Sequence, residues 1–324
     1  MSDTQEANTR LDPIVGKGRV IDFMSMRRAA FAISIVLAIV AIVAIAARGL
    51  NVGVDFTGGT LIELSYPEPV ELGGVREALR GAGYEEAVAQ LFGSPRDVLV
   101  RIAAGAEENA NTLADRVVAA LRATPNGQHI ELRRVEFVGP QVGAELAQNG
   151  ALAVLLSLAG ILIYIAVRFE KRLAAGAVLG LIHDILILVG IWAAFQLDFD
   201  LTVLAALLAT LGYSLNDTIV IYDRIRENFR KMRKGEPAEI INVSVTQTLT
   251  RTIITSGTTM LALIALYLFG GEVLRNFSLV LLIGIVIGTI STIFVSSALA
   301  LVLGVNKKDL MPVVKERSDS GALI

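Results

Sequence analysis

The chain has 324 residues, of which 54% are hydrophobic, and its formal net charge is −2. Its mean hydropathy of +0.62 is too high for an ordinary water-soluble protein and predicts an integral membrane protein. The absence of cysteine excludes disulfides, thiolate metal sites and cysteine nucleophiles, and the near-neutral charge offers nothing that would bind nucleic acid.

Six segments are apolar enough and long enough to cross a bilayer, for which a helix needs about 20 residues. These predicted spans are Ala29–Ala47, Leu146–Val167, Leu173–Phe195, Leu201–Tyr222, Thr248–Phe269 and Phe277–Leu303. The predicted organisation is an N-terminal segment (1–28), a first helix (29–47), a soluble domain (48–145), a five-helix bundle (146–303) with a connector at 223–242, and a tail (304–324).

Basic residues gather in every second loop along the chain. They are Arg27, Arg28, Arg168, Lys171, Arg172, Arg224, Arg226, Arg230, Lys231, Arg233, Lys234, Lys307 and Lys308. Of the two short loops on the opposite side, Leu197–Asp200 holds no basic residue and Gly270–Asn276 holds only Arg275. Because loops rich in lysine and arginine remain in the cytoplasm, we expect both termini to be cytoplasmic and the 48–145 domain to lie on the outer face.

The 48–145 segment alternates between strand and helix patterns. Strands are expected at Thr60–Tyr66, Ala87–Phe92, Val98–Ile102 and Ile130–Val138, and helices at Glu71–Ala82 and Glu107–Ala123. The order β-α-β-β-α-β is that of a split βαβ, ferredoxin-like unit. The predicted fold class is therefore a mainly α membrane protein, with six transmembrane helices and one small α+β ferredoxin-like domain between helices 1 and 2.

Two charged residues lie within predicted spans, Asp217 in the fourth and Arg251 in the fifth. A charge at the centre of a bilayer costs about 2.5–3.5 kcal/mol even on insertion scales, and such residues usually serve a function. The two helices run in opposite directions, so the charges are expected at similar depth, where they can pair. This predicts a proton relay or charge switch, while an ion pair that merely fixes helix packing is the alternative.

Further polar residues accompany this pair. They are Tyr213, Ser214, Asn216 and Thr218 on the fourth span, Thr255 on the fifth, and His183 and Asp184 on the third. Hydroxyl groups in membrane helices can hydrogen-bond across helices. We therefore predict a polar seam through three helices, although a packed or water-bonded role for His183 is equally open.

Motifs for bond-making chemistry are missing from the sequence. It contains no Walker lysine motif, no HExxH and no GxSxG. The glycine-rich stretch Gly53–Gly59 lacks the lysine and hydroxyl of a phosphate cradle, and a tight backbone bend is its simpler interpretation. The pairs Gly176/Gly180 and Gly284/Gly288 predict close helix contacts. We therefore expect no enzyme activity, no cofactor and no metal site.

Three stretches resemble a known family. Residues 53–60, which include Asp55, Gly58 and Gly59, are similar to the opening signature of the SecF family of protein-export membrane subunits. The stretch Leu211–Val220, followed by Tyr222–Asn228, is similar to the most distinctive part of that family, and Asn242–Ser256 matches the next part. The resemblance covers nearly the whole chain apart from its two tails.

The resemblance implies a subunit of the resistance-nodulation-division superfamily in the bacterial inner membrane. It implies a heterodimer with SecD, further partners in the SecYEG channel and YajC, and contact with unfolded preproteins, protons and membrane lipid. It also implies that Asp217 and Arg251 take part in proton conduction, which drives late stages of export. Two alternatives remain: a proton-driven small-molecule efflux transporter of the same superfamily, and a non-conducting membrane scaffold.

Overall fold

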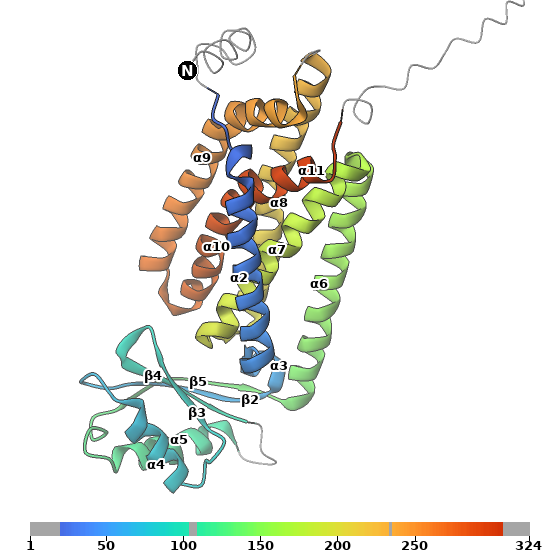
Figure 1. The fold of residues 1–324 in the computed structure, drawn as a ribbon. Coiled ribbons are helices and arrows are strands. Elements are labelled where there is room, and N and C mark those ends of the chain that lie inside the picture. The colour runs from blue at the N-terminus through green and yellow to red at the C-terminus, as the bar shows by residue number, and fades with distance from the viewer. Residues whose placement is uncertain (1–19, 104–108, 233–234, 307–324) are drawn as a thin grey trace, which may run out of the picture.

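The computed structural model of the protein describes residues 20–103, 109–232 and 235–306. Parts of the predicted N-terminal segment, the predicted C-terminal tail and the helix expected from Glu107 therefore lie outside the described residues. Within the described part, six helices are long and apolar enough to cross a membrane, and a small sheet domain sits at one end of their bundle (Figure 1). The predicted mainly α membrane architecture with one small α+β domain is therefore confirmed.

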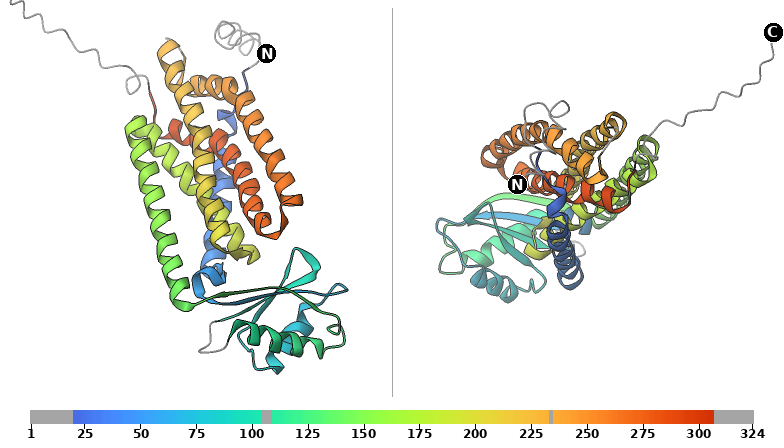
Figure 2. Two further views of the ribbon diagram at one scale, coloured as in Figure 1. Left: turned by 180° about the vertical axis from the view of Figure 1, so that it is seen from behind. Right: turned by 45° about the horizontal axis from the view of Figure 1, so that its top comes forward.

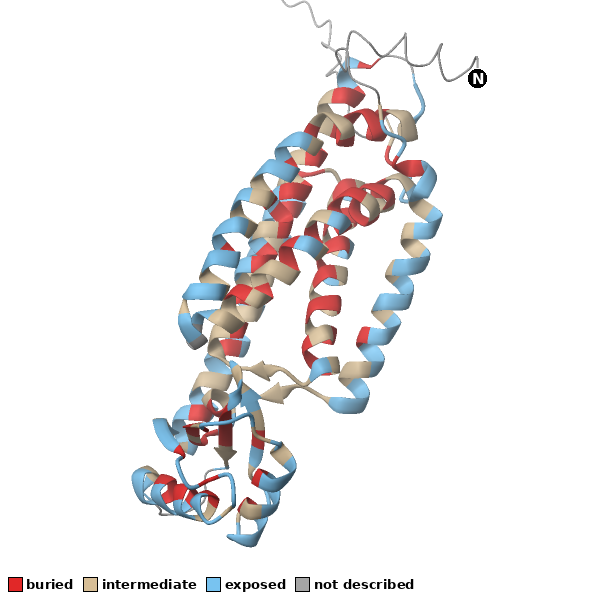
Figure 3. Ribbon diagram, turned by 90° about the vertical axis from the view of Figure 1, so that its left-hand side faces the viewer, coloured by how far each residue is buried: buried red, intermediate tan, exposed pale blue. Residues whose placement is uncertain are grey.

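The bundle places its most buried helices at the centre. Its helices are α2 (Arg27–Arg48) after a short η1 (Met24–Met26), α6 (Pro140–Arg168), α7 (Lys171–Phe195), α8 (Leu201–Lys231), α9 (Pro237–Phe269) and α10 (Gly271–Ser291), which continues through the π-helix η2 (Thr292–Ser296) into α11 (Ser297–Val302). The apolar stretches of α7, α8 and α10 are about half buried, whereas α2 and α6 expose nearly all of theirs (Figure 3). An exposed apolar surface of this kind is expected where lipid covers a helix.

Two helices extend beyond their predicted membrane spans. Helix α8 continues nine residues beyond Tyr222, and α9 begins at Pro237 rather than at Thr248, so the expected connector at 223–242 is largely helical. The extension of α8 is charged, but its charges pair along the helix: Glu227 accepts from Arg224 at 2.6 Å and from Lys231 at 2.5 Å. Residues within a helix bond their backbone groups to one another whether their side chains are apolar or charged, so the length of the apolar run underestimates the length of the helix here.

The small domain is a four-stranded sheet with two helices on one face. Its elements are β2 (Gly59–Ser65), α4 (Leu72–Gly81), β3 (Val88–Phe92), β4 (Ser94–Ile102), α5 (Ala110–Arg122) and β5 (Glu131–Val138). The strands lie in the order β3-β4-β2-β5, and each neighbouring pair is antiparallel. The chain order β-α-β-β-α-β is the predicted one. Alternate strand residues such as Ile62 and Val100 meet Val117 and Leu121 of α5 in a buried apolar core.

The domain and the bundle are joined by more than the chain itself. Strand β1 (Asn51–Val52), which follows α2, pairs in parallel with β6 (Asp198–Phe199), which precedes α8. The glycine-rich stretch after β1 forms the short helix α3 (Val54–Thr57) within the predicted bend. The domain helices lie on the side of the sheet that faces away from the bundle (Figure 2), so the opposite sheet face is turned towards the ends of the membrane helices.

Candidate functional site

Asp217 lies in the buried core of the bundle. Helix α8 begins at a strong N-cap, because the Asp200 carboxylate accepts from the backbone N–H of Val203 at 2.8 Å. Asp217, sixteen residues after the first helical residue Leu201, is only 2% exposed. Its Oδ2 atom is buried and accepts no hydrogen bond from the residues that the structure describes. Burying a carboxylate oxygen without a hydrogen-bond donor costs folding free energy. The packing of the surrounding helices must therefore compensate for keeping Asp217 in the core.

A chain of polar contacts crosses the bundle beside Asp217. Ser214 on α8 donates a 2.6 Å hydrogen bond to Asp184 on α7, and the other Asp184 oxygen lies 3.0 Å from Nδ1 of His183. Thr218 lies 3.0 Å from the hydroxyl of Thr292. Of the predicted seam, the structure therefore brings Ser214, Asp184 and His183 into one network and places Thr218 next to it.

The sixth span contributes hydroxyls that the sequence did not single out. Ser291 lies 3.4 Å from the His183 ring, and Thr289 lies 3.0 Å from Ser256 of α9. Thr292 and Ser296 lie in the π-helix η2, where the backbone carbonyl of Ser296 accepts from Tyr222 at 2.8 Å. π-Helical turns are rare and frequently mark functional sites. The only signal in the sequence was the recurrence of serine and threonine in an otherwise apolar span.

Arg251 does not form the predicted ion pair with Asp217. No salt bridge joins the two side chains in the part of the chain that the structure describes. The reason is rotational: Arg251 points outward from α9, on the same exposed face as Ile254. The position of Arg251 along α9 would allow it to pair with Asp217, but its side chain lies on the outer face of the helix.

Three other predicted residues stand apart from the network. Tyr213 is half-buried and donates to Thr259 of α9 at 3.4 Å, a long hydrogen bond. Thr255 donates back to carbonyls of its own helix, and Asn216 is exposed on the outside of the bundle. The polar seam is therefore narrower on α8 than expected, because residues one apart on a helix point about 100° away from each other.

The predicted glycine pairs lie at close helix contacts beside the network. A Cβ atom on Gly284 would lie 2.3 Å from Cγ2 of Thr210, and one on Gly288 would lie 2.9 Å from Cβ of Ser214. On α7, a Cβ on Gly180 would lie 1.9 Å from Oγ of Ser296. These glycines let α7, α8 and η2–α10 approach closely enough for their hydroxyl groups to meet.

Asp55 and the two glycines after it lie far from the seam, at the junction of domain and bundle. The Asp55 carboxylate accepts from the backbone N–H of Leu201, the first residue of α8, at 3.0 Å. Gly58 has φ +69°, and a Cβ there would lie 2.9 Å from Cα of Pro140, the first residue of α6. Gly59 has φ +133°. Both glycines are needed where the chain turns from α3 into β2 against the start of α6.

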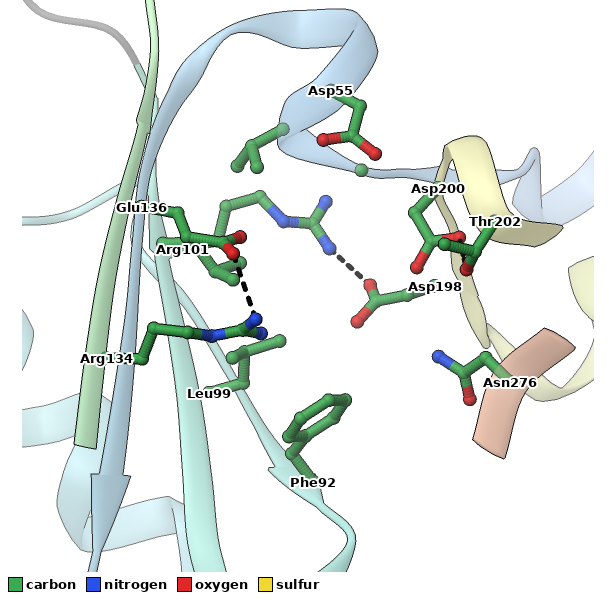
Figure 4. Close-up of a pocket in the computed structure, with 13 residues that line it drawn as sticks. Asp55, Phe92, Leu99, Arg101, Arg134, Glu136, Asp198, Asp200, Thr202 and Asn276 are labelled. Atoms are coloured by element: carbon green, nitrogen blue, oxygen red, sulfur yellow. Dashed lines mark hydrogen bonds and ion pairs between the residues drawn. The ribbon is translucent and has the colours of Figure 1, made fainter. Parts of the chain in front are cut away.

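A pocket lies at this junction, between the open sheet face and the ends of the bundle helices (Figure 4). Arg101 on β4 forms an ion pair across it with Asp198 in the loop before α8, and both side chains are about nine-tenths buried. Burial raises the pKa of the Asp198 carboxyl above its ordinary value, although Arg101 and Gln90 oppose that rise. Nothing in the local sequence around these two residues indicated that they would meet.

Comparison with known proteins identifies relatives along most of the chain. Residues 118–306 match the family model described as "Protein export membrane protein SecD/SecF, C-terminal", and residues 43–70 match the "SecD/SecF GG Motif". The chain is 50% identical over 299 residues to the protein translocase subunit SecF of Vibrio alginolyticus, which covers 92% of this chain and 95% of that one. It is also 50% identical over 309 residues to SecF of Escherichia coli O157:H7, covering 94% and 95%.

A solved structure shares the fold. The crystal structure of SecDF from Thermus thermophilus, titled as a translocon-associated membrane protein, superposes with a TM-score of 0.79 at 36% identity. That match covers 91% of this chain but 41% of the SecDF chain, so this chain spans less than half the length of that protein. A second SecDF structure, in a super-membrane-facing form, matches with a TM-score of 0.64 and 37% identity.

Proposed function

The chain belongs to the SecD/SecF family of protein-export membrane proteins, and we propose that it couples the proton-motive force to late stages of export. Its relatives are named as subunits of a protein translocase, so it is a multi-pass inner-membrane accessory of Sec export and not an enzyme. SecD is its partner within that translocase. The proposal adds the energy source and assigns it to particular residues.

The observation that carries the proposal is the unpaired Asp217 oxygen in the bundle core. A carboxylate that lacks a donor in a low-dielectric setting is stabilised by taking up a proton. The hydroxyls of Ser256 and Thr289 and the group of Asp184, Ser214 and His183 supply acceptors and donors close by. Protons moving through the bundle would therefore change the charge of α8 at Asp217.

The exposure of Arg251 favours a site that is completed by SecD. An arginine cannot lose its proton in practice, and Arg251 is exposed on a helix face that also carries Ile254, Thr258 and Leu261. A charge on a lipid-facing surface is unfavourable at membrane depth. We infer that SecD helices cover this face, and that Arg251 turns towards Asp217 or towards SecD according to the charge of the carboxylate.

The orientation of the chain in the membrane follows from the distribution of basic residues. We propose that both termini and the α6–α7 and α8–α9 turns are cytoplasmic, because Arg168, Lys171 and Arg230 lie there. The sheet domain is then periplasmic, where it can meet an emerging preprotein. SecYEG and YajC complete the proposed assembly. The division into a 48–145 domain and a 146–303 bundle stays a prediction.

The proposal is tested in inverted inner-membrane vesicles that contain the Sec channel and SecD, with or without this chain. The measured quantity is the ratio of precursor translocation with a proton gradient to translocation without one. We expect the ratio to rise only when the chain is present. A chain that binds SecD without changing the ratio would be a scaffold, and gradient-dependent dye efflux without any effect on precursors would indicate an efflux transporter.

A further inference from the structure

Arg101 gathers three separate parts of the chain around one side chain. It belongs to β4 of the sheet domain and forms the ion pair with Asp198 in the loop between α7 and α8. The same guanidinium donates to the Oδ1 atom of Asn51 at 3.1 Å and to the carbonyl of Val52 at 2.6 Å, both in the segment after α2. A planar guanidinium can hold several acceptors in fixed directions at once, which lysine cannot do.

Asp198 also accepts hydrogen bonds from residues other than Arg101. Its carboxylate also accepts from the Asn51 amide at 2.9 Å and from Gln90 on β3. Asn51 and Asp198 are paired in the two-residue parallel ladder of β1 and β6. The ion pair is thus embedded in a hydrogen-bonded group of four residues drawn from two strands of the domain and from two membrane-helix ends.

This group lies directly before α8, which carries Asp217. Leu201, the first residue of α8, donates to Asp55, so the helix end is also tied to α3. From Leu201 to Asp217 the helix runs about 24 Å at 1.5 Å per residue. Asp198 lies three residues before α8 begins, so a shift of α8 as one unit would displace it.

We propose that the Arg101–Asp198 pair is the joint through which movement of α8 is transmitted to the sheet domain. This inference rests on the proposed function, because it takes a change at Asp217 as the source of the movement. Arg101 and Asp198 are positioning residues here: they touch neither the proton nor the exported chain. When Arg101 is replaced, the domain remains attached by its covalent linkers, by the Gln90 hydrogen bond to Asp198, and by Arg275 of α10, which donates to the Gly93 carbonyl at 2.6 Å. None of these replaces the links from Arg101 to Asp198, Asn51 and Val52.

Arg134 offers a matched control. It lies on β5, lines the same pocket as Arg101 and forms its ion pairs with Glu63 and Glu136 inside the domain (Figure 4). Arg134→Met therefore removes an arginine from the same sheet face without touching the bundle. Arg101→Met removes the joint, and Asp198→Asn, which nearly preserves shape, tests it from the opposite side.

The experiment uses the full chain with a cysteine-free SecD in vesicles. This chain has no cysteine of its own, so cysteines introduced at Thr112 on α5 and Phe269 at the end of α9, both exposed, accept spin labels selectively. The distance distribution between the labels is measured with Asp217 and with Asp217→Asn, alongside the gradient stimulation of translocation and the recovery of SecD in a pull-down.

We expect the distribution to shift when Asp217 is changed in the parent chain and in Arg134→Met. In Arg101→Met and Asp198→Asn it should broaden and no longer respond, and gradient stimulation should be lost while SecD is still bound. Full gradient stimulation with a normal response in both joint variants would overturn the inference and leave the proposed function standing. Loss of SecD binding in both would also overturn it, because that is the outcome of a purely structural role. A parent chain in which Asp217→Asn changes neither readout would instead defeat the proposed function.

Discussion

Ser214 on α8 donates a 2.6 Å hydrogen bond to the Asp184 carboxylate on α7, one turn before Asp217 on the same helix. The contact joins two of the three half-buried helices of the bundle through a charged acceptor, and hydrogen bonds to charged groups are stronger than those between neutral ones. Since Asp184 also contacts His183, which lies near Ser291 of the last span, movement of α8 would be felt by three membrane helices.

Ser214→Ala is therefore expected to loosen α8 from α7. Losing a hydrogen bond to a buried charged group costs about 1.5–3 kcal/mol, which should lower the thermal unfolding temperature of the purified complex. Ser278→Ala is the matched control, because Ser278 is equally buried but donates to Leu274 within its own helix. Equal stability losses in both variants would show that the hydrogen bond between α8 and α7 stabilises the bundle no more than a hydrogen bond within one helix.

Gly284→Ala is expected to push α10 away from α8. The new Cβ would lie 2.3 Å from Cγ2 of Thr210, and overpacking of this kind typically costs about 1–3 kcal/mol. Gly212→Ala provides the comparison, because a Cβ at Gly212 on α8 meets nothing within 4 Å and alanine favours a helix over glycine. Thermal unfolding in detergent should separate the two variants. If Gly284→Ala is as stable as Gly212→Ala, the helices do not depend on this close approach.

Tyr66→Phe should stabilise the sheet domain or leave it unchanged. The Tyr66 hydroxyl is buried and has no hydrogen-bond partner among the described residues, and an unsatisfied buried group costs about 1–3 kcal/mol. Burial raises the pKa of Tyr66 to about 12, so its neutral form is favoured by folding and the parent domain loses stability as pH rises from the ordinary value near 10 through 12. Hydrogen exchange of β2 should show that Tyr66→Phe reduces this alkaline loss. Marked destabilisation by Tyr66→Phe at neutral pH would contradict the prediction.

Asp97 is expected to make the stability of the same domain depend on pH in the acid range. Burial acts to raise the pKa of Asp97, but hydrogen bonds from Ser94 at 2.6 Å and Ser65 at 2.7 Å, together with nearby arginines, outweigh it and leave the pKa below its ordinary value. The ionised form therefore stabilises the folded domain above the ordinary carboxyl pKa, and that contribution is lost as pH falls through the lowered pKa. Hydrogen exchange should show a flatter acid profile in Asp97→Asn but not in Asp115→Asn, which changes an exposed carboxylate. Identical profiles would refute this assignment.

The sequence was sufficient for the architecture because two strong periodic signals produce it. Apolar runs of bilayer length identify the membrane helices, and alternation identifies the strands of the domain. Helix ends were harder to predict: the start of α9 contains Asn242 and Ser244, which are polar yet buried. Asn242 accepts from the Met24 backbone at 3.0 Å, a partner more than two hundred residues away, and no local pattern indicates such a contact.

The candidate site was likewise predictable only in part. Asp217 could be predicted from charge in an apolar span alone. The outward direction of Arg251 could not, since the phase of one helix against its neighbours is set by packing contacts such as Gly284 on Thr210. The Arg101–Asp198 pair was also beyond local reasoning, because its two members are brought together only when the domain folds onto the bundle.

The most direct test of the account is the gradient stimulation of precursor translocation by Asp217→Asn in inverted vesicles with SecD. Asp223→Asn on the same helix is the control, because Asp223 pairs with Arg168 near the far end of α8. We predict that Asp217→Asn still co-purifies with SecD but translocates no faster with a gradient than without one, while Asp223→Asn keeps its stimulation. Undiminished stimulation in Asp217→Asn would contradict the central claim that this carboxylate couples the proton gradient to export.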